Sequence, residues 1–274
     1  MDITETPAPE PDLVVTNVDG VMTIMLNRPR RKNALSVSMV HGITAAVETA
    51  AHDDSVRVIV IRAAGDDFCT GIDLVESNRP DRAGGRPRAG HMQRGFNYGA
   101  HRMIRALDIV QIPVVTVVRG WAAGIGNALA LNADVVIADT SAKFWVPMVP
   151  RGFTPDSGNT WLLPRLVGVA RAKQMLLRGK PVDGTTAERW GLIAECVAPD
   201  ELDAAASAVV DELRHAATLA FGLTKTLIHR NLEVDYASAL QNEGIYEELA
   251  IRTDDFKEGI RSFSEKRPPD YQGR

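Results

Sequence analysis

Apolar residues near the start of the chain first alternate with polar ones and then recur three or four positions apart. Residues 13–27 alternate enough to predict a hairpin that turns at residues 17–20. Ser36 fits the N-cap of a following helix, because apolar residues recur at helical spacing over 40–50. The chain is therefore expected to begin with a strand pair followed by a helix.

Strand and helix patterns alternate through the next part of the chain. Continuous apolar, β-branched runs predict strands at 56–61, 113–118 and 134–138. Helical spacing predicts helices over roughly 97–109 and 124–132. Strands that alternate with helices predict an α/β architecture.

Beyond about residue 165 the pattern is helical throughout. Thr185-Thr186-Ala187-Glu188 matches a capping box that begins one helix, and helices near 201–216 and 235–263 follow. The last of these is charged with widely spaced apolar residues, so we expect it to pack against the core or a neighbouring subunit. The predicted division is an α/β core over 1–200 and a helical C-terminal region over 201–274.

Composition limits the partners and the compartment. A formal net charge of -4 over 274 residues gives no global attraction to nucleic acid or to an anionic membrane. Cys69 and Cys196 have no metal-ligand spacing and the histidines are scattered singly, so we predict neither a disulfide framework nor a metal site. No signal peptide and no apolar stretch of membrane-spanning length is present. These features predict a cytoplasmic protein without nucleic-acid or membrane partners.

Two glycine-bearing turns carry the candidate chemistry, one at 68–74 and one at 124–127. Each follows an apolar run that predicts a strand, so each can direct backbone N–H groups at one point. Two converging N–H donors suit a carbonyl oxygen that becomes an oxyanion, and this favours an enzyme that acts on thioesters. The alternative for either turn alone is a plain strand-to-helix connection, in which glycine is equally useful.

A Gly-, Pro- and Arg-rich stretch at 79–95 follows the first turn and shows no periodicity, which predicts a mobile surface loop. It is either a solvated insertion or a lid near that turn. We favour the solvated insertion, because no aromatic residues interleave with its arginines as nucleic-acid stacking would need.

Several motifs in order resemble the enoyl-CoA hydratase/isomerase (crotonase) superfamily from about residue 13 to the C-terminus. The motifs are Leu26-Asn27-Arg28-Pro29 with Asn33-Ala34-Leu35-Ser36, the two turns at 68–74 and 124–134, the segment 155–168 and the ending at 258–267. The resemblance implies a crotonase-like spiral of β-β-α repeats with a helical C-terminal trimerisation region. It also implies a homotrimer or dimer of trimers, and an acyl-CoA thioester substrate with coenzyme A as part of that substrate and no tightly bound cofactor.

The resemblance assigns site residues by motif position. The oxyanion donors would be the backbone N–H groups of Ile72 and Ile125. The residues implied to contact the substrate or its CoA are Arg30, Lys32, Ala34, Thr70, Gly71, Asp73, Leu74, Gly124, Met148, Phe263 and Lys266. Phe263 and Lys266 could come from a neighbouring subunit, and a solvated surface charge is the alternative for each basic residue.

This chain differs from the family's hydratases at the positions of their catalytic acids. The two positions that hold glutamates in hydratases of the family are Ala128 and Met148 here, and neither side chain can move a proton. Asp156 lies one turn further on, where some isomerases of the superfamily place a carboxylate. One carboxylate that removes a proton at one carbon and returns it at another suffices for allylic isomerisation. The alternative for Asp156 is an N-cap of the helix that begins near Ser157.

We therefore predict an enoyl-CoA isomerase in which Asp156 shuttles the proton. A hydratase with rearranged acids and a non-catalytic acyl-CoA binder are the alternatives. Asp73 is expected to fix its loop through side-chain hydrogen bonds. Cys69 is expected to be a small buried residue and no nucleophile, because no histidine with an orienting group is suggested nearby.

Overall fold

A six-stranded sheet, in the order β1-β2-β3-β4-β6-β9, forms the centre of the computed structural model, which describes residues 11–73 and 88–274. Its strands are β1 (Leu13–Val18), β2 (Val21–Leu26), β3 (Val58–Ala63), β4 (Val114–Val118), β6 (Val135–Asp139) and β9 (Glu195–Val197). β1 pairs with β2 antiparallel, and all other neighbours are parallel. The mixed α/β class predicted from the alternating patterns is confirmed.

The hairpin and first helix form where the local sequence predicts them. Asp19 and Gly20 turn the β1–β2 hairpin with φ angles of 51° and 80°, values that short-side-chain residues and glycine adopt most readily. Ser36 accepts a hydrogen bond from the Met39 amide and caps α1 (Val37–Ala50). The apolar face of α1 is buried against the sheet.

A second, three-stranded sheet lies beside the first and makes the chain a spiral. It contains β5 (Trp121–Ala123), β7 (Lys143–Trp145) and β8 (Val182–Asp183). Each full turn of the spiral contributes a long strand, a short strand and a helix, as in β4, β5 and α5 (Ile125–Leu131). Isolated parallel bridges extend the short-strand ladder to the preceding turns, at Cys69–Ala122 and Leu35–Ile72.

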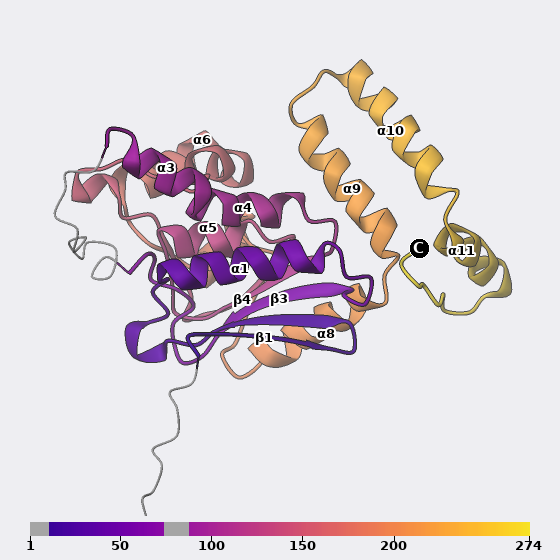
Figure 1. Cartoon of the computed structure of the whole chain (residues 1–274), viewed down its shortest axis with the longest axis horizontal. Coiled ribbons are helices and arrows are strands. Elements are labelled where there is room, and N and C mark those ends of the chain that lie inside the picture. Colours follow the sequence, from indigo (N-terminus) through magenta and orange to yellow (C-terminus); the bar gives the residue numbers. More distant parts are fainter. Residues whose placement is uncertain (1–10, 74–87) are drawn as a thin grey trace, which may run out of the picture.

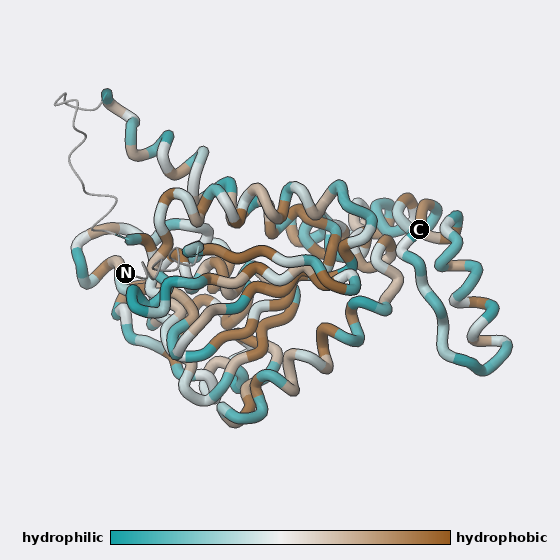
Figure 2. Tube along the Cα trace, turned by 60° about the horizontal axis from the view of Figure 1, so that its bottom comes forward, coloured by the Kyte–Doolittle hydropathy of each residue, from teal (hydrophilic) through white to brown (hydrophobic). Residues whose placement is uncertain are grey.

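Helices cover both faces of the central sheet (Figure 1). α1, α4 (Ala100–Ile109) and α5 lie on one face, together with α6 (Asn159–Arg178), and α8 (Leu202–Arg214) covers the other. Successive side chains of β3 alternate between the two layers: Ile59 belongs to the large cluster and Val60 packs with Leu202. Figure 2 shows the apolar strands enclosed in the middle of the molecule.

Three helices extend from this core as a C-terminal arm, namely α9 (Thr218–Asn231), α10 (Tyr236–Ala250) and α11 (Asp254–Glu265). The prediction of one long helix over 235–263 is wrong. The helix stops at Ile251, and Thr253 caps a new one by accepting a hydrogen bond of 3.0 Å from the Phe256 amide. The division at residue 200 stays a prediction, and α8 packs on the central sheet.

Three other local predictions are corrected. The chain beyond 165 is not helical throughout, because β8 and β9 join the two sheets. Asp183, not Thr185, caps α7 (Gly184–Trp190), and Glu188 instead accepts a hydrogen bond from the Cys196 amide. Residues 91–95 are not loop but part of α3 (His91–Tyr98), whereas most of the predicted loop lies outside the described residues.

Short 3-10 turns complete the fold at η1 (Pro29–Arg31) and η2 (Val149–Arg151).

Candidate active site

The two glycine turns lie side by side because they occupy the same place in successive turns of the spiral. Cys69 pairs with Ala122: the Cys69 amide donates to Trp121 O and the Ala123 amide to Cys69 O, each at 2.8 Å. The turns stay close beyond this pair: a Cβ on Gly71 would lie 3.2 Å from Ala123 O, and a Cβ on Gly124 would lie 4.0 Å from Gly71 Cα. Ile72 and Ile125 are the next residues of the two turns. Neighbouring strands are about 4.8 Å apart, which is a spacing from which two amides can reach one oxygen.

The Ile72 amide points toward the second turn because the edge facing the other way is already used. On that edge Leu35 N donates to Gly71 O and Asp73 N donates to Leu35 O, both at 2.8 Å. In a parallel ladder the intervening residue, Ile72, then directs its own N–H to the opposite edge. Within the described part of the chain this N–H has no hydrogen-bond acceptor.

The Ile125 amide is available for a different reason, since Ile125 is the first residue of α5. The first amides of a helix have no intrahelical acceptor, and among residues 11–73 and 88–274 none accepts from Ile125 N–H. The preceding Gly124 amide is tied to Trp145 O at 2.9 Å, which fixes the turn. The positive end of the α5 dipole also favours negative charge at this point.

Glycine is required at the second turn for conformation and for space. Gly124 has φ 59° and ψ -120°, a region that residues with a Cβ avoid. A Cβ on Gly126 would lie 2.4 Å from Cys69 O and 2.8 Å from Cys69 Sγ. The two turns can therefore approach closely only because Gly126 has no side chain.

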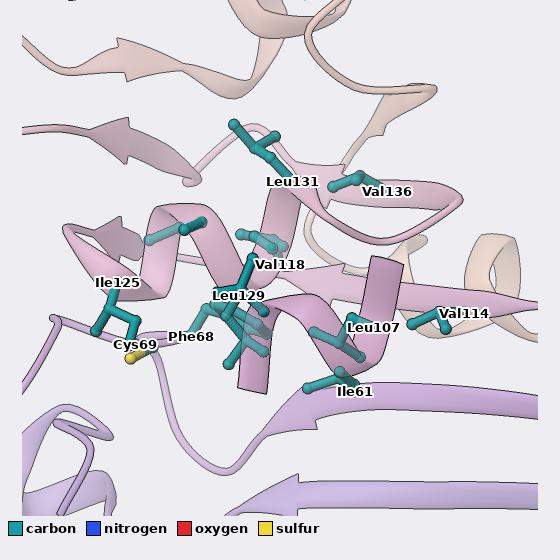
Figure 3. Close-up of a cluster of buried hydrophobic side chains, with 14 of the residues drawn as sticks. Ile61, Phe68, Cys69, Leu107, Val114, Val118, Ile125, Leu129, Leu131 and Val136 are labelled. Atoms are coloured by element: carbon teal, nitrogen blue, oxygen red, sulfur yellow. The ribbon is translucent and has the colours of Figure 1, made fainter. Parts of the chain in front are cut away.

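Cys69 serves this packing and has no nucleophilic chemistry. Its side chain is fully buried in the large core cluster, and Figure 3 shows it beside Ile125. Burial raises the pKa of the Cys69 thiol to about 12, so the thiolate is not formed near neutral pH.

Asp73 holds the first turn in place. Its Oδ2 pairs with the guanidinium of Arg28 at 3.1 Å, and both side chains are largely buried. Arg28 also donates to Ala34 O at 2.8 Å, so one arginine connects the end of β2 to the first glycine turn. Sequence reasoning expected Asp73 to fix its loop and missed Arg28 as the partner.

The two positions that the resemblance assigns to hydratase glutamates are apolar and buried. Ala128 lies on α5 and is 1% exposed, and Met148 is 5% exposed. A Cβ on Gly124 would lie 3.5 Å from Met148 Cε, so Met148 borders the second turn. No proton can be taken up or released by either side chain.

Asp156 supplies a carboxylate in the same neighbourhood. Its Oδ1 is buried and has no hydrogen-bond partner in the described part of the chain. The alternative reading as an N-cap is wrong: α6 begins at Asn159, its N-cap is Gly158, and no side chain caps it.

Two buried asparagines connect the main chain of Asp156 to the second turn. Asn127 on α5 donates from Nδ2 to Asn159 Oδ1 at 2.8 Å, and Asn159 donates from Nδ2 to Asp156 O at 2.9 Å. Asn127 is 0% and Asn159 1% exposed. Sequence reasoning missed this connection, because nothing local marks two residues so far apart in the chain as partners.

Part of the predicted CoA-contacting set gathers beside the first turn. Thr70 donates from both its amide and its hydroxyl to Lys32 O at 3.1 Å, and Lys32 Nζ lies 3.3 Å from Asp67 Oδ2. Arg30 is exposed on η1. Leu74 lies outside the described residues.

The remaining predicted contacts are far from the turns within one chain. Phe263, 86% exposed, and Lys266 lie on and at the end of α11. α11 lies at the opposite end of the molecule from α3 and α6 (Figure 1). One chain alone therefore does not bring these two residues to the glycine turns.

Within the part of the chain that the structure describes, no group of three or more His, Cys, Asp or Glu residues is placed to hold a metal ion. No helix in that part of the chain combines the length and apolarity that a membrane crossing requires.

Known proteins resemble the chain over almost its whole length. The family profile described as enoyl-CoA hydratase/isomerase matches residues 16–274. The 1,2-epoxyphenylacetyl-CoA isomerase of Escherichia coli K12 is 35% identical, with 96% of this chain and 99% of that protein covered. The 2,3-dehydroadipyl-CoA hydratase of the same organism is 31% identical, with the same two coverages.

Solved structures agree with the sequence relatives. The enoyl-CoA hydratase of Bacillus anthracis superposes with a TM-score of 0.88 at 29% identity, over 96% of this chain and 100% of that one. An enoyl-CoA hydratase of Mycobacterium smegmatis gives 0.86 at 32% identity, over 96% and 99%. The names include hydratases and an isomerase, and the family acts on CoA thioesters. The chain belongs to the enoyl-CoA hydratase/isomerase family.

Proposed function

We propose that this protein is an enoyl-CoA isomerase that moves a double bond from C3=C4 to C2=C3 of an acyl-CoA. The thioester oxygen would be held by the amides of Ile72 and Ile125, and Asp156 would carry the proton. The observation that carries the proposal is the buried Oδ1 of Asp156, which has no hydrogen-bond partner among the described residues and lies on a segment tied to α5 through Asn159 and Asn127. Ala128 and Met148, at the positions where hydratases hold acids, are apolar and buried.

The proton balance needs one carboxylate and no water. Asp156 takes a proton from C2, and the resulting negative charge resides on the thioester oxygen as an enolate. The same carboxyl group then returns the proton to C4, which leaves the double bond between C2 and C3. Amide donors stabilise the enolate more than the neutral ester, and loss of one such donor costs roughly 10²–10³ in rate.

The CoA portion would pass the first turn. Arg30 and Lys32 offer cationic side chains for the phosphates of CoA. The substrate could approach the main chain closely at four residues with small side chains or none, namely Ala34, Thr70, Gly71 and Gly124. Arg and Lys suit phosphate groups through charge-assisted hydrogen bonds.

A second copy of the chain would complete the site. α10 and α11 expose apolar side chains that the arm leaves uncovered, among them Leu240, Ile245, Ile260 and Phe263. Burying them against another copy would carry Phe263 and Lys266 to a neighbour's CoA. We propose a homotrimer or a dimer of trimers, and sedimentation equilibrium measures which one forms.

Parallel assays of a 3-enoyl-CoA and a 2-enoyl-CoA test the function. We expect 2-enoyl-CoA to appear from the first substrate, and Asp156→Asn to reduce that rate by at least about 10²-fold. Efficient formation of 3-hydroxyacyl-CoA, unchanged in Asp156→Asn, would show a hydratase instead. Tight acyl-CoA binding in calorimetry, without turnover of either substrate, would show a non-catalytic binder.

A further inference from the structure

Buried polar atoms without partners concentrate at the junction of α5 and α6. In the described residues they include Asn127 Oδ1, Asp156 Oδ1 and Ser157 Oγ. Buried polar groups in native proteins are nearly always hydrogen-bonded, so a cluster of exceptions indicates groups that a bound molecule satisfies. Asp156 has a role in the proposed reaction, but nothing in that reaction uses the hydroxyl of Ser157.

Ser157 is buried in a strained backbone conformation. It is 2% exposed and adopts φ 54°, a conformation that costs free energy for any residue with a Cβ. It follows Asp156 directly and, together with Gly158, lines a cavity of about 300 Å³. Asp156 itself does not line this cavity, and Ser157 is the residue that joins the two in the chain.

The walls of the cavity suit a short acyl group with a polar end. Ile104 of α4 and Trp161 and Leu162 of α6 supply the apolar part. His101 and Asn132 supply further hydrogen-bonding groups. A volume of about 300 Å³ is at the small end for ligand pockets, which favours a short chain.

The charges on the walls favour a neutral polar group over an ion. One basic and one acidic side chain, Arg105 and Asp108, both line the cavity. Asp108 Oδ1 also lies 3.1 Å from His229 Nδ1. Because both signs are present, neither a cation nor an anion gains a clear advantage from the walls.

We infer that the substrate's acyl group carries a neutral hydrogen-bonding oxygen several carbons from the thioester, and that Ser157 binds this oxygen. The inference rests on the proposed function for the placement of the thioester. An unsubstituted alkyl chain would leave the Ser157 hydroxyl unpaired and desolvate the polar walls. A site built to hydrogen-bond a substrate oxygen discriminates strongly against the analogue that lacks it.

The test compares 3-hexenoyl-CoA with 6-hydroxy-3-hexenoyl-CoA. We expect kcat/KM to favour the hydroxylated substrate by about tenfold or more in the wild type. Ser157→Ala should bring the ratio close to one. Thr160→Ala, which removes an exposed hydroxyl from the same helix, is the matched control and should leave the ratio as in the wild type. Ser157→Gly tolerates φ 54° and repeats the measurement if the alanine variant does not fold.

Binding of saturated analogues separates this inference from the proposed function. Calorimetry with hexanoyl-CoA and 6-hydroxyhexanoyl-CoA reports the same preference without any isomerisation. If neither enoyl substrate reacts but the hydroxylated analogue binds about tenfold tighter in a Ser157-dependent way, the isomerase proposal fails and this inference stands. The inference is overturned if the two substrates isomerise with equal kcat/KM, or if Ser157→Ala leaves their kcat/KM ratio unchanged. In either case water is the only hydrogen-bond partner of the Ser157 hydroxyl.

Discussion

Asn127 Nδ2 donates a hydrogen bond of 2.8 Å to Asn159 Oδ1 and so joins the start of α5 to the segment that carries Asp156. Asn159 in turn donates to Asp156 O from its amide at 3.1 Å and from Nδ2 at 2.9 Å. Since Ile125 lies two residues before Asn127, these hydrogen bonds connect the main chain of Asp156 to the turn that holds the proposed Ile125 donor. In the proposed reaction, Asn159 would therefore be a positioning residue for Asp156.

Replacing Asn159 should misplace the carboxylate without disturbing CoA binding. We expect Asn159→Ala to lower kcat by up to about 10²-fold, because small displacements of a reacting group have effects of that size. KM should stay within about twofold. Steady-state kinetics on a 3-enoyl-CoA measures both constants, and a changed KM with an unchanged kcat would contradict the positioning role.

A matched asparagine pair provides the control. Asn242 Nδ2 donates to Asn231 Oδ1 at 3.0 Å between α10 and α9. Asn242→Ala should lower stability by about 1–3 kcal/mol, as loss of a buried hydrogen-bond partner does, and leave kcat of the folded enzyme intact. If both variants lose stability and kcat alike, the Asn159 effect is one of folding.

Adding a methyl group at Gly126 should push the two glycine turns apart. The new Cβ would lie 2.4 Å from Cys69 O, and backbone cannot move away as a flexible side chain can. We expect Gly126→Ala to cost about 1–3 kcal/mol of stability and roughly 10²–10³ in kcat through displacement of the Ile125 donor. The control is Gly244→Ala on α10, where the new Cβ has no neighbouring atom within 4 Å. We expect this variant to keep or raise the stability of the protein, because alanine favours a helix more than glycine does. Full activity in Gly126→Ala would refute the close approach.

The two thiols should differ in reactivity. Because burial raises the pKa of Cys69 to about 12, we expect it to stay unmodified by iodoacetamide at pH 8 in the folded protein. Cys196 is partly exposed and should be modified, although burial raises its pKa as well. Mass spectrometry counts one label before denaturation and two after it. Rapid labelling of Cys69 in the native state would show a reactive thiol at the glycine turns.

The C-terminal tail should loosen in acid. Glu258 accepts hydrogen bonds from Arg267 and from the Asp270 amide, and these contacts lower its pKa from 4.5 to about 2. A lowered folded-state pKa gives stability that is present above 4.5 and is lost as the pH falls toward 2. The difference in unfolding free energy between the wild type and Glu258→Gln should therefore shrink over this window. A difference that is constant with pH would show that the ion pair contributes nothing.

Short-range signals explain which elements were predictable. Ser36 and the turn at Asp19-Gly20 act through residues within four positions of themselves, and both formed as predicted. The capping box at Thr185 failed because Glu188 is engaged by the Cys196 amide of β9. The break at Thr253 carried a local signal, an N-cap threonine before two aspartates, that the periodicity of the longer stretch concealed.

The candidate site likewise has some features that local sequence predicts and others that it does not. The glycine turns were predicted from motifs, and the parallel register of Cys69 with Ala122 explains why they meet. The role of Asp156 stays a prediction. The asparagine pair and the unpaired Ser157 hydroxyl depend on where α6 begins relative to α5. No pattern of hydrophobic spacing reports that relationship.

In the proposed reaction, the Ile72 and Ile125 amides together hold the thioester oxygen. A crystal structure with a bound acyl-CoA that the enzyme cannot isomerise would show where this oxygen lies. We predict that the carbonyl oxygen lies about 2.7–3.1 Å from both nitrogens. A thioester bound elsewhere, or amides that point apart in the complex, would contradict the account.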